Sequence, residues 1–356
     1  MSREAGSGSE PLAYFAGRLA TGLRDVTSDL SALDSSGYWA VVGTYEGEWT
    51  LARFDDVREA PLPAPSPNAA WTGPDRDAWV SSLGQSTYEG AVKKIRDEIA
   101  HGEVYQVNLC RILSAPIAPE ADPLALAARL AEGNPAIYAG VVDIPGTRVV
   151  TASPELYLRR VGRTAISEPI KGTARTPDEL LPKDTAENVM IVDLVRNDLA
   201  RVAATGTVEV PSLLRVEPYP GLVHLVSTVT AELLPDAGWP ELIGATFPAG
   251  SISGAPKSSA LRIIEELETA PRGPYCGAVG WVDADRGVGE LAVGIRTFWW
   301  RDGRLCFGAG AGITWGSDPR GEWNETELKA TRLLAVASGA PAPSSPAERS
   351  RLTDVG

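Results

Sequence analysis

The sequence predicts an α+β fold with a largely antiparallel sheet, and two observations on the order of its elements support this prediction. Strand-like runs are clustered and do not alternate regularly with helices, as they would in a parallel sheet. Helix-like segments lie between the clusters, near residues 123–132, 184–203, 256–268 and 319–337. Hydrophobic residues make up 44% and charged residues 22% of the 356 residues, a balance typical of a soluble globular protein.

The predicted strands are short apolar runs bounded by turn residues. In the N-terminal part, the run YWAVVGTYEGEWTLARF predicts two paired strands. Further along the chain, the strand-like runs are AIYAGVVD, RVVTA, LYLRRV, GAVGWVDA, LAVGIRTFWW and RLCFGAGAGI.

One predicted helix and the strand that follows it show clear periodicity. The helix has apolar residues at helical spacing and ends before Gly102; these residues are Tyr88, Val92, Ile95 and Ile99. The next segment, VYQVNLCRIL, alternates as a strand does, and one of its faces carries Gln106, Asn108 and Cys110. We expect this polar face to line a water-filled cavity. Taken alone, the pattern favours the alternative of an exposed sheet face.

The chain is predicted to consist of one main domain with a short segment before it. Residues 1–80 form the N-terminal segment and linker, in which Arg58–Trp79 is rich in proline and polar residues. Residues 81–338 form the catalytic domain, and residues 339–356 form a disordered tail rich in proline, serine and charge.

Charge, cysteine usage and hydropathy exclude several classes of function. A formal net charge of −13 argues against nucleic-acid binding through a basic face. No run of about 18 apolar residues predicts a membrane span, and the first residues lack the apolar core of a secretory signal. Three widely spaced cysteines indicate reduced thiols and neither a disulfide framework nor a zinc site. These features predict a cytoplasmic protein.

Two predicted helices each carry acidic residues three positions apart. Asp184 and Glu187 lie in DTAENVMIVDLVRNDLARV, and Glu322 and Glu325 lie in DPRGEWNETELKATRLL. Residues three apart share a helix face, so the two faces could enclose one Mg²⁺, which takes one or two carboxylates directly and keeps several waters. Taken alone, the spacing favours solvated helix faces, where Glu325 and Lys329 form an ordinary i,i+4 ion pair.

A series of motifs from about Thr87 to Leu334 resembles the chorismate-binding enzyme family, which includes anthranilate, isochorismate, salicylate and aminodeoxychorismate synthases. In chain order, the matching stretches are GEVYQVNL, SPELYL, EPIKGTART, AENVMIVDLVRNDLARV, HLVSTV, FPAGSISGAPK, RGPYCGAVGW, GIRT, GAGAGITWGSDP and EWNETELKA. They occur in the family's order at family-like spacing, which makes the match specific. The resemblance implies a chorismate-utilising enzyme fold: antiparallel β-sheets packed in a sandwich with surrounding helices, and an active site in the cleft between them.

The resemblance also implies roles for individual residues. Glu187 and Glu325 match the magnesium-binding acids, with Asp184 and Glu322 as outer partners, and the metal would hold the ring carboxylate of chorismate. The positions that match substrate contacts are Tyr275, Arg296, Gly310, Gly312, Lys329, His224, Ser251, Thr173 and Gln106. The two glycines would let main-chain amides approach an anion, and the histidine would orient the ring.

Three positions separate the members of this family. Gln106 stands where isochorismate and salicylate synthases carry a lysine that activates water, and an amide cannot act as a base. Lys171, in PIKGT, stands where anthranilate synthases typically have alanine and aminodeoxychorismate synthases have a nucleophilic lysine. Glu155, in SPEL, matches the general acid for the departing 4-hydroxyl. The chain is therefore most similar to aminodeoxychorismate synthase component I, which implies formation of 4-amino-4-deoxychorismate for p-aminobenzoate and folate.

The implied amination needs a source of ammonia. No glutamine-amidotransferase signature surrounds any of the cysteines, so a separate glutaminase subunit is the expected partner. Two alternatives remain open: anthranilate synthase component I, which would also eliminate pyruvate and aromatise the ring, and a non-catalytic subunit that only docks a glutaminase. A secondary-metabolite pathway that uses the same product also remains open.

Overall fold

A computed structural model of the chain describes residues 10–65, 71–219 and 222–338. The α-helices are α1 (Gln85–Ala100), α2 (Pro123–Gly133), α3 (Pro182–Ala200), α4 (Trp239–Thr246), α5 (Lys257–Leu267) and α6 (Pro319–Ala337). The strands are β1 (Leu12–Phe15), β2 (Arg18–Thr27), β3 (Tyr38–Gly43), β4 (Trp49–Glu59), β5 (Val80–Ser81), β6 (Gln106–Pro116), β7 (Tyr138–Ile144), β8 (Thr147–Ser153), β9 (Leu156–Val161), β10 (Thr164–Glu168), β11 (Ile170–Ala174), β12 (Glu209–Tyr219), β13 (Leu222–Glu232), β14 (Gly254–Ala255), β15 (Ala278–Asp283), β16 (Val288–Val293), β17 (Thr297–Arg301) and β18 (Arg304–Ile313).

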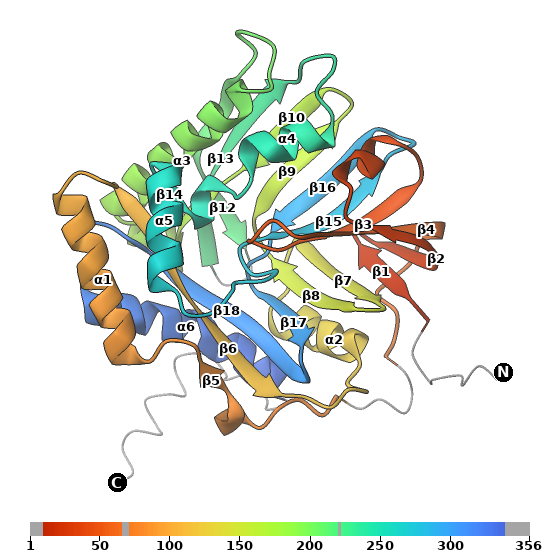
Figure 1. Cartoon of the computed structure of the whole chain (residues 1–356), viewed down its shortest axis with the longest axis horizontal. Helices are drawn as coiled ribbons and strands as arrows, with labels where there is room; N and C mark the ends of the chain where they lie inside the picture. Colours follow the sequence, from red (N-terminus) through yellow and green to blue (C-terminus); the bar gives the residue numbers. More distant parts are fainter. Residues whose placement is uncertain (1–9, 66–70, 220–221, 339–356) are drawn as a thin grey trace.

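The strand pairings of the described residues are antiparallel and join into one continuous path, which confirms the predicted α+β class. From β6 the path runs through β18, β17, β8, β7, β1, β2, β4 and β3. It continues through β15, β16, β9 and β10 to β13, which pairs with both β11 and β12. The helices lie on the outside of this curled sheet (Figure 1).

Three apolar clusters hold the helices to the sheet. Helices α1 and α5 bury residues such as Tyr88, Ile95 and Ile263 against Val107 and Leu109 of β6. Helices α2 and α6 pack on β7, β8, β17 and β18, and the largest cluster joins β3, β15 and β9 to α3 and α4. Because fully burying one such side chain stabilises the fold by about 1.5–3 kcal/mol, these clusters fix where the helices lie.

The structure confirms the helices expected from the sequence as α1, α2, α3, α5 and α6, and the expected strands are present. The polar face of β6 is buried: Gln106, Asn108 and Cys110 are 2%, 9% and 1% exposed, so it is not an exposed sheet face. Strands β1 and β3 pair with β7 and β15, so the N-terminal segment shares the main sheet. The domain limits remain a prediction, and the tail from residue 339 lies outside the described residues.

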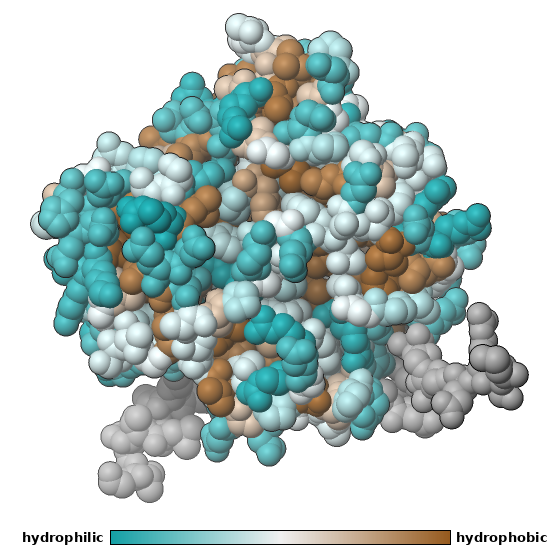
Figure 2. All heavy atoms as spheres, in the orientation of Figure 1, coloured by the Kyte–Doolittle hydropathy of each residue, from teal (hydrophilic) through white to brown (hydrophobic). Residues whose placement is uncertain are grey.

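No helix among the described residues is long and apolar enough to cross a membrane. The face of the molecule in Figure 2 is mostly hydrophilic or intermediate, with hydrophobic residues in separate patches.

Candidate functional site

The predicted site residues come from both ends of the strand path. Lys171 lies on β11, which pairs with β13 at one end, while Gln106 lies on β6 at the other and Gly312 on β18 beside it. A Cβ placed on Gly312 would lie 2.2 Å from Gln106 Nε2 and 3.8 Å from Lys171 Nζ. The curl of the sheet thus brings the two ends together, and glycine at position 312 leaves room for both side chains.

Helices α3 and α6 carry the four predicted acids. Asp318 caps α6, where its carboxylate accepts a hydrogen bond of 2.7 Å from Gly321 N, and this fixes the first turn that bears Glu322. At the start of α3, Asp184 Oδ2 accepts from Leu181 N at 2.8 Å. Asp184 therefore caps its own helix, and its carboxylate is engaged locally.

The acids of the two helices interact electrostatically. Burial raises the pKa of Glu187, and the charges of Asp184 and Glu325 raise it further, against Lys171 and Lys183. Burial also raises the pKa of Glu322, against a hydrogen bond from Ser317. The charge of Glu325 on α6 thus acts on Glu187 of α3 across the site.

Lysines balance these carboxylates. Lys171 Nζ lies 4.0 Å from Glu187 Oε2, and Lys329 Nζ lies 2.7 Å from Glu325 Oε1. Burial acts to raise the pKa of Glu325, but the Lys329 ion pair together with the charges of Lys183 and Lys171 lowers it.

The donor set suits Mg²⁺ in kind and in number. Within the described residues, no group of three or more His, Cys, Asp or Glu side chains is arranged to hold a metal. However, Mg²⁺ needs only one or two carboxylates and completes its shell with water and substrate oxygens. Glu187 and Glu325 can supply those two.

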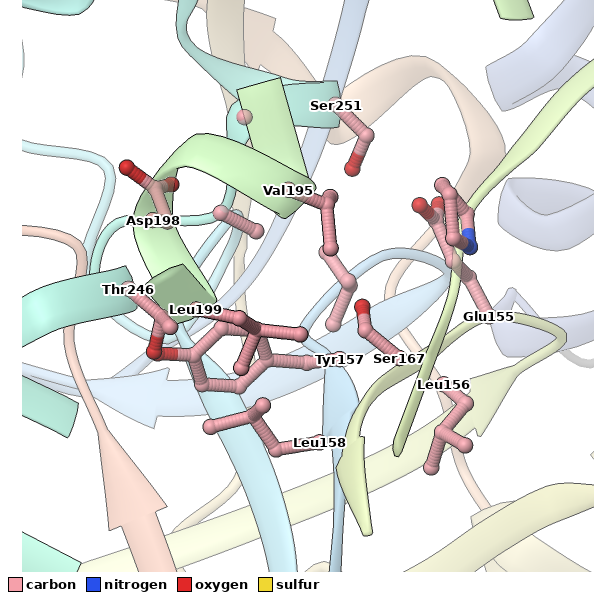
Figure 3. A pocket seen from close by; sticks show the side chains of 14 residues that line it. Glu155, Leu156, Tyr157, Leu158, Ser167, Val195, Asp198, Leu199, Thr246 and Ser251 are labelled. Atoms are coloured by element: carbon pink, nitrogen blue, oxygen red, sulfur yellow. The ribbon is translucent and has the colours of Figure 1, made fainter. Parts of the chain in front are cut away.

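Glu155 is a buried carboxyl beside the lysine. Its side chain is 4% exposed and follows β8 in the SPEL segment. Burial raises its pKa, against a hydrogen bond from the Ser251 hydroxyl, the charge of Lys171 and the amide of Ile170. Figure 3 shows the Ser251 hydroxyl and the Glu155 carboxylate at the edge of one cavity. A carboxyl with a raised pKa beside an amine is suited to act as a general acid.

His224 is held neutral next to a cation. It is 2% exposed on β13, opposite Thr173 of β11, whose side chain lies outside the described part of the structure. Burial and the charge of Arg296 lower the His224 pKa to about 4, against Glu217 and a hydrogen bond with the Gly172 backbone. Arg296 itself has a φ of 51° between β16 and β17, a conformation that is uncommon outside glycine.

The remaining predicted contacts form a connected group on β6, β18 and α6. Lys329 Nζ donates a 3.0 Å hydrogen bond to the carbonyl of Gly310, which pairs with Cys110 across β18 and β6. Cys110 Sγ lies 3.9 Å from the Tyr275 hydroxyl. One connected group therefore contains Tyr275, Gly310, Lys329 and Glu325. A second group contains Lys171, Glu187, Glu155 and Ser251. Their roles remain predictions.

Two residues that the sequence did not single out lie at the site. The charge of Lys183, in the first turn of α3, acts on Glu187, Glu322 and Glu325. Ser167 of β10 lines the same cavity as Glu155 and Ser251. The position of Lys183 one residue before Asp184 was a usable signal, whereas no sequence pattern marks Ser167.

Comparisons with known proteins place the chain in a family. A family model described as chorismate binding enzyme matches residues 38–335. Anthranilate synthase component 1 of Streptomyces coelicolor is 40% identical over 304 residues, which are 80% of this chain and 59% of that protein. Aminodeoxychorismate synthase component 1 of Klebsiella aerogenes is 36% identical over 311 residues, 83% of this chain and 68% of that protein.

Solved structures show the same fold. A structure described as a 2,3-dihydroxybenzoate-specific isochorismate synthase from Bacillus anthracis has a TM-score of 0.77 at 25% identity, covering 95% of this chain and 98% of that one. Anthranilate synthase component I from Streptococcus pneumoniae has a TM-score of 0.75 at 25% identity, covering 93% and 91%. The chain spans 55% to 60% of the length of several curated anthranilate synthase relatives.

Proposed function

This chain belongs to the chorismate-binding enzyme family, and on that premise we propose that it aminates chorismate to 4-amino-4-deoxychorismate, as an aminodeoxychorismate synthase component I. One observation carries the proposal. The amine of Lys171 lies among Glu187, Gly312 and Glu155, inside the group of predicted site residues. A nucleophile needs to lie beside the general acid and the metal-binding acids, and anthranilate synthases typically have alanine at the matching position.

The side chains of this site can divide the reaction into two displacements. Lys171 Nζ adds to ring carbon C2, the double bond shifts, and the bond from C4 to its hydroxyl breaks as Glu155 donates a proton, releasing water. Ammonia then bonds to C4, the bond between Lys171 and C2 breaks, and the surplus proton returns to Glu155. The lysine and the acid end as they began.

The acids and the lysines would hold the substrate for these steps. Mg²⁺ bound by Glu187 and Glu325, with Glu322 and Asp184 as outer partners, would supply the positive charge that lets an anionic ring carboxylate approach this acidic cleft. Tyr275, Arg296, Lys329 and the backbone at Gly310 and Gly312 would receive the second carboxylate. Neutral His224 would orient the ring.

Ammonia would come from a separate glutaminase subunit, or from ammonium salts in vitro. The product would then serve the synthesis of p-aminobenzoate and folate.

Anthranilate formation is the second candidate, because the relative from Streptomyces coelicolor, at 40% identity, is an anthranilate synthase component 1. Incubation with chorismate, Mg²⁺ and ammonium chloride, followed by separation of the products, decides between the two. We expect a non-aromatic amino product that an added lyase converts to p-aminobenzoate. Fluorescent anthranilate would overturn the proposal. Absence of Mg²⁺-dependent chorismate binding in calorimetry would instead support a subunit that only docks a glutaminase.

A further inference from the structure

A small cavity lies behind the carboxyl of Glu155. Its volume is about 20 Å³, and it is lined by residues of β9, β10, α3 and the segment around Ser251. Polar groups face it from Glu155, Ser251 and Ser167, while Val195 and Leu199 provide apolar walls (Figure 3). A cavity of this size has room for one molecule as small as water.

Ser167 is the unexplained member of this cavity. Its side chain is 6% exposed, and among the described residues its hydroxyl has no hydrogen-bond partner. Ser167 pairs with Val229 of β13 and lies on the same buried face of β10 as Ala165. In Figure 3 the hydroxyls of Ser167 and Ser251 point into the same space. A hydroxyl at the wall of a cavity that has no partner among the described residues is free to bond a small guest molecule.

The other charged groups of the cavity do not offer a site for an ion. Asp198 is paired with Lys257, whose Nζ lies 2.6 Å from Asp198 Oδ2 and also donates to the carbonyl of Thr246. The Thr246 hydroxyl lies 2.7 Å from the hydroxyl of Tyr157. The hydroxyl of Ser167 and the Glu155–Ser251 pair therefore remain to contact a guest, which suits a small neutral molecule that both donates and accepts hydrogen bonds.

We propose that this cavity is the holding site for the ammonia that attacks the ring, with the Ser167 hydroxyl as its hydrogen-bond partner; the inference rests on the amination proposed above. The ammonia molecule would be bound next to Glu155, the group that has just donated its proton to the departing hydroxyl. When nitrogen bonds to C4 and Lys171 is expelled, the surplus proton passes from the new ammonium group to Glu155. The same carboxyl is thereby ready for the next turnover.

The test is steady-state kinetics of Ser167→Ala with ammonium chloride at fixed pH and saturating chorismate. Loss of one hydrogen bond should raise the KM for ammonia roughly three- to tenfold, with the KM for chorismate unchanged. Ser114→Ala is the matched control, because Ser114 bonds Arg304 on a strand segment away from the cavity. If Ser167→Ala lowers the melting temperature but leaves the KM for ammonia unchanged, the cavity holds a structural water and the proposal is wrong.

A second measurement uses the unaltered protein and so does not depend on how the variant folds. A cavity of about 20 Å³ fits one molecule the size of water, so an added methyl group would crowd its walls. Methylamine should therefore replace ammonia poorly, at least tenfold less efficiently at equal concentrations of free base, and equal use would contradict the proposal. Failure of the proposed function is distinct, because the unaltered protein would then form no aminodeoxychorismate.

Discussion

The amine of Lys171 lies 4.0 Å from the Glu187 carboxylate, in a contact that joins strand β11 to helix α3. Two residues that are 16 positions apart in the sequence thus contact each other in the fold. The contact places the proposed nucleophile beside the acid that is proposed to hold the metal. Each of the following predictions tests one part of this arrangement.

Replacing Lys171 with alanine should abolish the formation of aminodeoxychorismate while chorismate still binds, because the nucleophile is lost and the carboxylate-binding groups remain. Product analysis and calorimetry measure the two effects separately. Lys93→Ala, at an exposed position of α1, is the control and should retain full activity. Full activity of Lys171→Ala would exclude covalent catalysis by this lysine.

Glu155→Gln should lower kcat by about 10²- to 10⁴-fold, the range expected for loss of a general acid.

The same substitution should also change how the stability of the protein depends on pH. Burial raises the pKa of Glu155 above its ordinary value of 4.5, so folding favours the protonated form and the wild-type protein loses stability as pH rises from 4.5 through the folded pKa. The melting temperature of the variant, relative to wild type, should therefore increase over this range. A constant difference would show that the carboxyl is not held protonated.

The sequence predicted regular elements well and irregular ones poorly. Helix α1 and strand β6 have uninterrupted periodicity, and both were found where expected. Strand β12 was not predicted, because Pro211 and Pro218 interrupt it and proline argues against a strand. The structure accommodates them in an irregular strand that, within the described part of the chain, pairs with β13 alone and has Leu214 at a φ of 58°.

Some residues of the candidate site could likewise be predicted from the sequence, and others could not. Lys171 and Glu155 stand in motifs, so their positions could be compared with a family pattern. Ser167 lies on the same buried face of β10 as Ala165, by the ordinary alternation of a strand, but no motif singles it out in the sequence. The approach of Gln106, Gly312 and Lys171 depends on the curl of the whole sheet, which no local pattern encodes.

Glu187→Gln and Glu325→Gln should each weaken Mg²⁺-dependent binding of chorismate by about tenfold or more, because each removes one of two proposed direct ligands. Calorimetric titration of chorismate with and without MgCl₂ measures this effect. Glu265→Gln, at an exposed position of α5, should behave as wild type. If neither site variant changes the magnesium dependence, the cation binds elsewhere.

Protonation of His224 should lower the free energy of unfolding in weak acid. Its pKa is about 4 in the folded protein and about 6.5 when unfolded, so its contribution is fully present above pH 6.5 and is lost as pH falls toward 4. Between pH 7.5 and pH 5 this histidine should account for roughly 2 kcal/mol of the free energy of unfolding. Urea unfolding of wild type and His224→Gln at both values measures the difference. An equal loss in both proteins would contradict the prediction.

Gly312→Ala should disturb the site through Gln106. The added Cβ would lie 2.2 Å from Gln106 Nε2, so the end of this buried side chain, 2% exposed, would have to move. Overpacking of this kind costs about 1–3 kcal/mol and should shift the amide toward Lys171, so both the melting temperature and the rate of amination should fall. Gly316→Ala is the control, since its Cβ would have nothing within 4 Å. An unchanged rate in Gly312→Ala would show that the amide of Gln106 is not part of the reacting site.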